Sequence, residues 1–342
     1  MELNKGGMRK LFAILLIVSL TSLGCTKNVF YIHSSLQEEM DKAVESDFDG
    51  MIVLVNQAGV SSFYSAGYDN RENQTLADPH SLFKIASISK LYLAAAATKL
   101  IVADSLELDA KLTELLPEVK DRIEYAEDIT LKMLLQHRSG IKDWSYEPEI
   151  AGENYDDYMS FVARVYDKPA NFKPNKKYSY SNTNYLLLAE IMNRTLGYSH
   201  QDFIQVKILN PLGLVNTFHA YKDADTNKVM SGYVKGWDAD VRSIDFPLPG
   251  GNMIATAEDV GIFLRALVDG SLLSPEEQQI YSEVYKYGHT GWLPGYTSIA
   301  RYHSDIDAVV VQFVNTSGKE IFWLKLESMY NKIIHCVENE KL

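Results

Sequence analysis

Cysteine is nearly absent from this sequence of 342 residues, which contains only Cys25 and Cys336. A scaffold held together by several disulfides is therefore excluded, and we expect Cys336 to be an inert thiol on the last helix. The chain also lacks internal repeats, low-complexity tracts and linkers rich in proline or glycine. These absences predict one large domain, or two domains that pack closely together.

Basic residues are scarce as well, since 33 lysines and arginines stand against 45 acidic residues and give a net charge of -12. So acidic a surface argues against nucleic acid as a partner. The eight histidines show no H-E-x-x-H motif and no other paired spacing. We therefore expect neither a metal ion nor a cofactor.

The first residues are typical of an export signal. Residues 1–24 join a basic start to an apolar run, 11–23, that is too short to span a bilayer comfortably. Cys25 follows, as in a bacterial lipoprotein signal, although Ser22 stands where a large aliphatic residue is usual. We expect a periplasmic or cell-surface protein anchored through a lipid on Cys25; ordinary cleavage and a retained anchor are the alternatives. Without residues 1–24, which hold three basic residues and one acidic residue, 30 basic residues face 44 acidic ones, a net charge of -14.

Apolar periodicity predicts strands at both ends of the chain and helices between them. The expected strands are 51–56, 60–66, 287–292, 297–303 and 308–314. The expected helices are 34–46, 91–102, 129–136, 155–166, 185–196, 201–209, 257–267 and 322–337. Tight turns between neighbouring strands indicate an antiparallel sheet. The sequence thus predicts an α+β fold, with the sheet in residues 26–80 and 250–342, a mainly helical part in residues 81–249, and one continuous catalytic unit over 34–336.

Ser87 and Lys90 form the first candidate site. They precede a run that contains four successive alanines, and residues three apart on a helix share a face, so the amine can lie beside the hydroxyl. A hydroxyl becomes a strong nucleophile when a base takes its proton, and a lysine can be that base when burial lowers its pKa. The same S-x-x-K spacing occurs at Ser81 and Ser139. Ser81 lies in a β-like stretch and Ser139 precedes a glycine, so only the Ser87 pair opens a strong helix. The alternative is that Ser87 caps the helix and Lys90 is solvated.

Tyr180 and Asn182 form a second candidate, in a loop before an apolar helix. A phenol can act as a base where cations stabilise the phenolate, and an amide side chain suits an amide-bearing substrate. Alternatively, Asn182 or Thr183 is an N-cap. Another Y-x-N pattern begins at Tyr68, but it precedes Ser87 and has the composition of a plain turn.

His289, Thr290 and Gly291 form a third candidate at the start of a C-terminal strand. A glycine there lets the backbone approach a ligand closely. A cation at His289 and a hydroxyl at Thr290 could hold a carboxylate or polarise the tyrosine. Alternatively, the glycines only shape a sheet edge and His289 is solvated.

In this order the three motifs resemble those of the serine beta-lactamase-like family, which includes class C beta-lactamases, low-molecular-weight penicillin-binding proteins (DD-peptidases), esterases and D-aminopeptidases. The stretches 129–141, 180–214 and 249–259 are similar to the family too, so the resemblance covers nearly all of the chain after the signal. It implies an antiparallel sheet flanked by the N- and C-terminal helices, with an inserted, mostly helical domain.

The resemblance also implies roles. Ser87 would be the acylated nucleophile, Lys90 and Tyr180 would share the proton transfers, and Asn182 would contact the substrate amide. The backbone N–H groups of Ser87 and Trp292 would form an oxyanion hole. His289, Thr290 and Gly291 correspond to a lysine-threonine-glycine triplet that lines the substrate site. Because a histidine replaces the lysine, we expect a weak grip on a β-lactam carboxylate near pH 7, and a kcat/KM that falls with rising pH if His289 must be protonated.

We therefore expect a serine hydrolase that works through an acyl-enzyme on peptide, amide or ester bonds, with D-amino-acid peptides related to peptidoglycan as the favoured substrates. One alternative is an esterase or beta-lactamase of the same family. Another is a catalytically idle relative that binds peptidoglycan fragments or a partner; loss of Ser87, Lys90 or Tyr180 would indicate it, and all three are present. The expected partners are a small molecule or peptide, and the membrane only through Cys25.

Overall fold

The computed structural model describes residues 34–150, 153–154, 157–340 and 342. Residues 36–342 form one unit, to which the following description applies, and residues 1–35 form another. The predicted signal sequence and the lipidation of Cys25 lie outside the described residues. None of the helices in the described ranges combines the length and the apolar composition needed to cross a bilayer.

Strands from both ends of the chain meet in the middle of one antiparallel sheet. Its six strands follow the order β3-β2-β1-β10-β9-β8. β1 pairs with β10 from Met51 opposite Val314 to Gln57 opposite Ala308. β8 is an edge strand and pairs only with β9 within this sheet. The bounds are β1 Gly50–Gln57, β2 Val60–Asn70, β3 Thr75–Leu76, β8 Gly288–Leu293, β9 Tyr296–His303 and β10 Ala308–Val314.

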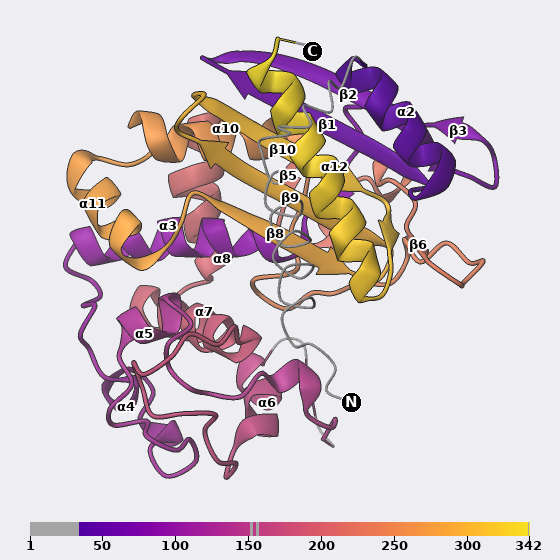
Figure 1. Ribbon diagram of the computed structural model, residues 1–342. Coiled ribbons are helices and arrows are strands. Elements are labelled where there is room, and N and C mark those ends of the chain that lie inside the picture. The colour runs from indigo at the N-terminus through magenta and orange to yellow at the C-terminus, as the bar shows by residue number, and fades with distance from the viewer. Residues whose placement is uncertain (1–33, 151–152, 155–156, 341) are drawn as a thin grey trace, which may run out of the picture. The chain divides into compact units, whose positions relative to one another are not determined.

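The two faces of the sheet bury different helices, because successive side chains of a strand point to opposite sides. Met51, Val53 and Val55 belong to one hydrophobic core with α2 (Leu36–Ser46) and α12 (Glu320–Glu338). Ile52 and Leu54 belong to another core, with α3 (Ser89–Val102) and α10 (Ala257–Asp269). Figure 1 shows the yellow α12 and the indigo α2 on one side of the strands.

α3 separates the sheet from the mainly helical part (Figure 1). Eleven of its 14 residues are buried, including all four alanines of 94–97, as expected of a helix enclosed on every side. The helical part contains α4 Leu112–Leu115, α5 Leu131–Leu135, α6 Tyr158–Val162, α7 Asn182–Leu196, α8 His200–Ile204, a π-turn at Gln205–Leu209 and α9 Asn210–Leu212. The described residues also form two minor sheets. One has the strand order β4 Phe83–Lys84, β7 Ile254–Ala255 and β5 Thr217–Phe218, and the other pairs β6 Tyr233–Val234 with β11 Thr316–Ser317.

The predicted α+β fold, with a sheet between the terminal helices and an inserted helical part, is confirmed. The longest helix that was not predicted from the sequence is α11 (Pro275–Val284), which leads into β8; the short α4 and α9 were not predicted either. Ser274 caps α11 through the Glu277 N–H while Glu277 caps Ser274 in return, and proline occupies its first position. The S-P-E-E pattern at 274–277 was therefore a usable helix start.

Candidate active site

Ser87 lies in a single tight turn at the head of α3. The turn is a 3-10 helix, Ala86–Ile88, and α3 proper begins two residues after Ser87. Ala86 adopts a φ of 51°, a left-handed conformation that an alanine takes only where its surroundings enforce it. The strained residue thus stands directly before the predicted nucleophile.

Lys90 lies beside Ser87 on the first turn of α3 and is buried to 1% exposure. Its Nζ is 3.2 Å from Ser87 Oγ, 2.9 Å from Asn182 Oδ1 and 2.6 Å from the Gly250 carbonyl oxygen. Burial lowers the pKa of Lys90 to about 7, and the negative charge of Asp143 opposes this shift in part. Near pH 7 roughly half of these amines are therefore neutral.

Tyr180 approaches Ser87 from the loop before α7. Its hydroxyl donates a hydrogen bond of 2.8 Å to Ser87 Oγ. Burial raises the pKa of Tyr180 well above its ordinary value, and the hydrogen bond with Ser87 only partly opposes this. The ring is thus a neutral phenol at pH 7, and the phenolate considered from the sequence is disfavoured.

Asn182 is fixed by two partners and stands on the first turn of α7. Its Oδ1 accepts from Lys90, and its Nδ2 donates to Asp143 Oδ2 at 2.9 Å. Asp143 Oδ2 also accepts from the Asn182 backbone N–H at 3.0 Å. The sequence analysis missed Asp143, because its contact joins a loop to the first turn of α7, 39 residues away, and follows no local spacing.

His137 supports the tyrosine loop. Its ring centroid lies 4.5 Å from that of Tyr180, and its Nδ1 accepts the Ser181 backbone N–H at 3.2 Å. Burial first, and then the charge of Lys90, lower the pKa of His137 to about 3. The neutral ring therefore carries its proton on Nε2, a buried atom with no hydrogen-bond partner among the described residues. From the sequence alone we would assign His137 only a structural place after its helix.

The third motif lies on β8, which passes against the Ser87 turn. A Cβ atom at Gly291 would come 2.5 Å from the Ile85 carbonyl oxygen and 2.2 Å from Ser298 Oγ, so only glycine permits this approach. Trp292, predicted as an oxyanion donor through its backbone, follows directly, and its side chain is half exposed. Thr290 stands on the same strand.

His289 is not the cation that the sequence suggested. It is buried, and this burial, followed by the charge of Lys90, lowers the pKa of His289 to about 3. Its Nδ1 contacts the Thr290 carbonyl oxygen, which can only accept, so Nδ1 carries the proton of a neutral ring. A carboxylate grip through a protonated His289 near pH 7 is therefore not supported.

The rival motifs lie in unrelated networks. Ser81 Oγ donates to Asp69 Oδ2 at 2.9 Å, while Lys84 on β4 donates to the carbonyl oxygens of Arg242 and Ile244. Ser139 Oγ is buried and hydrogen-bonded to Asn184 Oδ1 at 2.8 Å. Only the Ser87 pair, among the three S-x-x-K patterns, brings its lysine to its serine. No group of three or more histidine, cysteine, aspartate or glutamate side chains in the described part of the chain is arranged to hold a metal ion.

A sheet with an inserted helical part, in which a serine contacts a buried, partly neutral lysine, defines a serine hydrolase. The family model described as Beta-lactamase matches residues 35–286, which is 252 of the 342 residues. The chain therefore belongs to the beta-lactamase family. The matched range ends three residues before His289, so the triplet on β8 lies just beyond it.

The individual relatives described here are each less than 30% identical to this chain. A penicillin-binding protein of Bacillus subtilis (strain 168) is 28% identical over 212 residues, which are 59% of this chain and only 44% of that protein. The teichoic acid D-alanine hydrolase of Staphylococcus aureus is 22% identical over 335 residues, covering 90% of this chain and 80% of its own. Among solved structures, the D-amino acid amidase from Ochrobactrum anthropi SV3 superimposes with a TM-score of 0.79 at 22% identity, over 90% of this chain and 99% of that one.

Proposed function

We propose that this protein hydrolyses D-amino-acid derivatives through an acyl-enzyme on Ser87. The contacts of Lys90 carry the proposal. A neutral amine has two N–H groups and one lone pair, and its neighbours Gly250 O and Asn182 Oδ1 can only accept hydrogen bonds. The two N–H groups go to these acceptors, so the lone pair is left for the Ser87 O–H. This arrangement favours Lys90 as the base that activates Ser87.

In the proposed acylation, Ser87 Oγ attacks the carbonyl carbon of the substrate while its proton passes to Lys90. The backbone N–H groups of Ser87 and Trp292 stabilise the resulting oxyanion; one such donor is commonly worth about 3–4 kcal/mol. Tyr180, neutral and hydrogen-bonded to Oγ, gives its proton to the leaving nitrogen or oxygen and regains one from Lys90. The C–N or C–O bond breaks, and the acyl group remains as an ester on Ser87.

Deacylation uses the same groups, with water in place of Ser87 as the nucleophile. A water molecule attacks the ester carbonyl, and its proton passes to Lys90, which is neutral again after the first half-reaction. The ester bond breaks, Ser87 Oγ takes back a proton from Tyr180, which regains one from Lys90, and the acid product leaves. Asn182, fixed by Asp143 and Lys90, is positioned to contact the substrate amide.

The choice of D-amino-acid substrates rests on the relatives. One is a teichoic acid D-alanine hydrolase and another a D-amino acid amidase, and both cover about nine tenths of this chain. Penicillin-binding proteins are also among the relatives, so a DD-peptidase-like activity on peptidoglycan peptides fits the same site. The neutral His289 argues against efficient capture of a β-lactam carboxylate by that residue.

A covalent probe tests the nucleophile. Intact-mass spectrometry should show one adduct with a fluorophosphonate, and this adduct should vanish in Ser87→Ala. Ser81→Ala, which removes the serine of a rival motif, is the matched control and should label like the wild type. Labelling that persists in Ser87→Ala would reject Ser87 as the nucleophile, and no labelling of folded wild type would favour an idle binding relative.

Enantiomeric substrates test the specificity. D-alanine amide and a D-alanyl ester should be hydrolysed with higher kcat/KM than their L counterparts, and a lasting penicillin adduct would point to the DD-peptidase branch. Equal rates on both enantiomers would contradict the D-amino-acid assignment and leave a general esterase.

We also propose that the chain is exported and anchored through a lipid on Cys25. The basic start, the apolar run and the position of the cysteine support this. Cys25→Ser should release the protein from the membrane fraction, and unchanged fractionation would argue against the anchor.

A further inference from the structure

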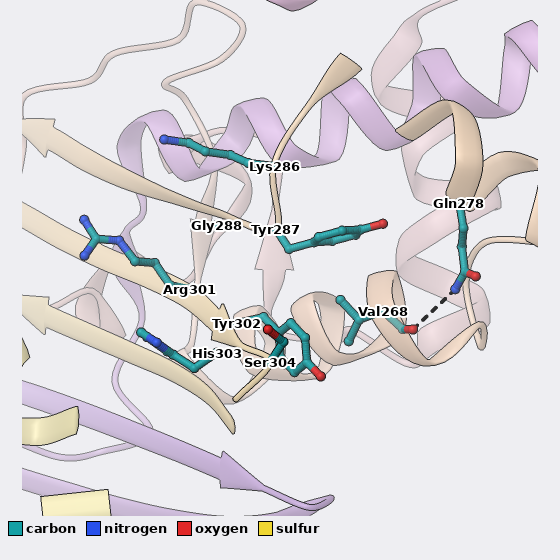
Figure 2. A pocket seen from close by; sticks show the side chains of 9 residues that line it. All are labelled: Val268, Gln278, Lys286, Tyr287, Gly288, Arg301, Tyr302, His303 and Ser304. Atoms are coloured by element: carbon teal, nitrogen blue, oxygen red, sulfur yellow. Dashed lines mark hydrogen bonds between the residues drawn. The ribbon is translucent and has the colours of Figure 1, made fainter. Parts of the chain in front are cut away.

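Lys84 is a buried lysine that the proposed mechanism does not use. Like Lys286, it has a pKa that is lowered chiefly by burial, but the surroundings of the two lysines differ. Lys286 lines an open pocket of about 580 Å³ at the start of β8, and Figure 2 shows its side chain extending away from Tyr287. Lys84 is enclosed, with only 2% exposure, and stands on β4 three residues before Ser87. Its partners therefore indicate its role.

The Lys84 ammonium holds a segment, residues 235–253, that contains neither helix nor strand. Its Nζ donates to the carbonyl oxygens of Arg242 and Ile244, at 2.6 and 2.5 Å. The Nζ also lies 4.3 Å from the centre of the Tyr221 ring, a cation–π distance. An ammonium has three N–H groups, and two carbonyl oxygens and one aromatic face receive them. Burial lowers the pKa of Lys84 to about 8, while the charge of Asp245 opposes the shift, so most of these amines are protonated at pH 7.

Both ends of a short loop are fastened to Lys84. Its backbone pairs with Ile254 on β7, while its side chain holds the Ile244 carbonyl oxygen. The nine residues between these two points, 245–253, thus form a loop that is closed on a single residue. Closing so short a loop restricts the backbone conformations that it can adopt. The connection from Lys84 to the active site runs through this backbone.

Gly250 is the residue of this loop that meets the candidate base. Its carbonyl oxygen accepts from Lys90 Nζ at 2.6 Å, and its φ of 78° is left-handed. A Cβ atom at Gly250 would lie 3.2 Å from Lys90 Nζ, tighter than an ordinary contact, so the two residues are closely packed. Lys90 keeps its lone pair for Ser87 only while its two N–H groups point at Gly250 O and Asn182 Oδ1. The position of the Gly250 carbonyl oxygen therefore orients the base.

We propose that Lys84 is a positioning residue, which fastens the loop 245–253 so that the Gly250 carbonyl oxygen orients Lys90 toward Ser87. This rests on the proposed function, in which Lys90 is the base, and it gives the hydrolase a second lysine that acts through the first. The number of acceptors distinguishes the two lysines. Lys84 meets three and stays an ammonium, whereas Lys90 meets two and retains a lone pair for the serine proton.

The rate of fluorophosphonate labelling of Ser87 in the full chain, followed from pH 5 to pH 9, tests this role. Lys84→Met keeps the length of the side chain and removes all its donors. Its plateau rate constant should fall about tenfold, because a misplaced base takes the serine proton less effectively. The acid limb, which reports the pKa of Lys90, should move to lower pH, because the Lys90 ammonium loses an acceptor. Lys84→Arg keeps the charge and the donors and should restore most of the rate.

Variants of the neighbouring turn separate this role from a loss of stability. Tyr221→Phe keeps the aromatic face and should label like the wild type, whereas Tyr221→Leu should label about threefold more slowly. Lys222→Met, which changes an exposed lysine beside Tyr221, should alter nothing. A merely structural Lys84 would lower the labelled fraction and leave the acid limb in place, and this result would overturn the proposal. If Lys84→Met does not fold, an acid limb in Tyr221→Leu equal to that of the wild type overturns it as well.

The same assay distinguishes failure of this role from failure of the proposed function, because labelling needs an activated Ser87 but no D-amino-acid substrate. If the acid limb moves in Lys84→Met while no D-alanine derivative is hydrolysed, the D-amino-acid assignment is wrong and the positioning role stands. If Lys84→Met labels at the wild-type rate at every pH, the positioning role is rejected and the hydrolase stands. If folded wild type is not labelled at all, the proposed function fails and the role of Lys84 fails with it.

Discussion

Replacing Lys90 by methionine should change how the free energy of unfolding depends on pH. In the folded protein burial lowers the pKa of Lys90 from 10.5 to about 7. The unfolded chain therefore binds more protons between these two pH values, and stability rises with pH across that window. The destabilisation is fully present below pH 7 and disappears above pH 10.5.

The magnitude follows from the size of the shift. About 3.5 pKa units at 1.36 kcal/mol per unit amount to roughly 5 kcal/mol at low pH, of which about 2 kcal/mol should be regained between pH 7 and pH 9. Lys90→Met removes this titration. The stability of the wild type relative to Lys90→Met should thus rise by about 2 kcal/mol over these two pH units.

Urea unfolding at pH 6, 7, 8 and 9, followed by tryptophan fluorescence, measures both proteins under the same conditions. The offset between the two curves includes the lost contacts to Asn182 and Gly250, whereas the change of the offset with pH reports the lysine alone. Curves that stay parallel from pH 6 to pH 9 would refute a depressed pKa, and with it the neutral base.

Three other perturbations have defined outcomes. Asp143→Asn removes a charge that raises the pKa of Lys90, so the acid limb of kcat/KM should move to lower pH. The rate at pH 7 should still fall about tenfold, because Asn182 loses its charged partner. An unmoved limb would show that Asp143 acts only on Asn182. Gly291→Ala should cost about 1–3 kcal/mol in thermal unfolding and abolish labelling of Ser87, whereas Gly251→Ala, with no atom closer than 3.9 Å to the added Cβ, should be nearly neutral. His289→Gln should leave the shape of the kcat/KM profile unchanged between pH 5 and pH 9, because the ring is neutral throughout; loss of a descending limb would contradict this.

Much of the fold could be predicted because its signals are local. The nearly continuous apolar runs in 51–56 and 308–314 marked β1 and β10, and the 3.6-residue period marked α10 and α12. The i, i+3 spacing correctly brought Lys90 to Ser87, since both lie at one helix start. Some boundaries shifted: α7 begins at Asn182, three residues before the expected start, which places that residue inside the helix rather than before it.

What escaped the sequence depends on contacts between distant segments. Asp143 reaches Asn182 from a loop 39 residues away, and Gly250 O reaches Lys90 across 160 residues. The charge of His289 could not be predicted either, because its pKa reflects how completely the surrounding segments bury it. Sequence spacing identified the side chains, whereas their protonation states required the packed structure.

The pairing of β1 with β10 also governs how the protein can be made. Gln57 and Ala308 are strand partners, yet 251 positions separate them along the chain. During synthesis the β1 edge of the β1–β2 hairpin therefore stays unpaired until roughly the last tenth of the sequence has been made. An unpaired strand edge can pair with other chains, so this stage is prone to aggregation. A premature stop shortly before residue 308 would remove β10, a central strand of the sheet and not an edge strand. Ser87, Lys90 and Tyr180 would all have been translated, but the sheet would lack its centre.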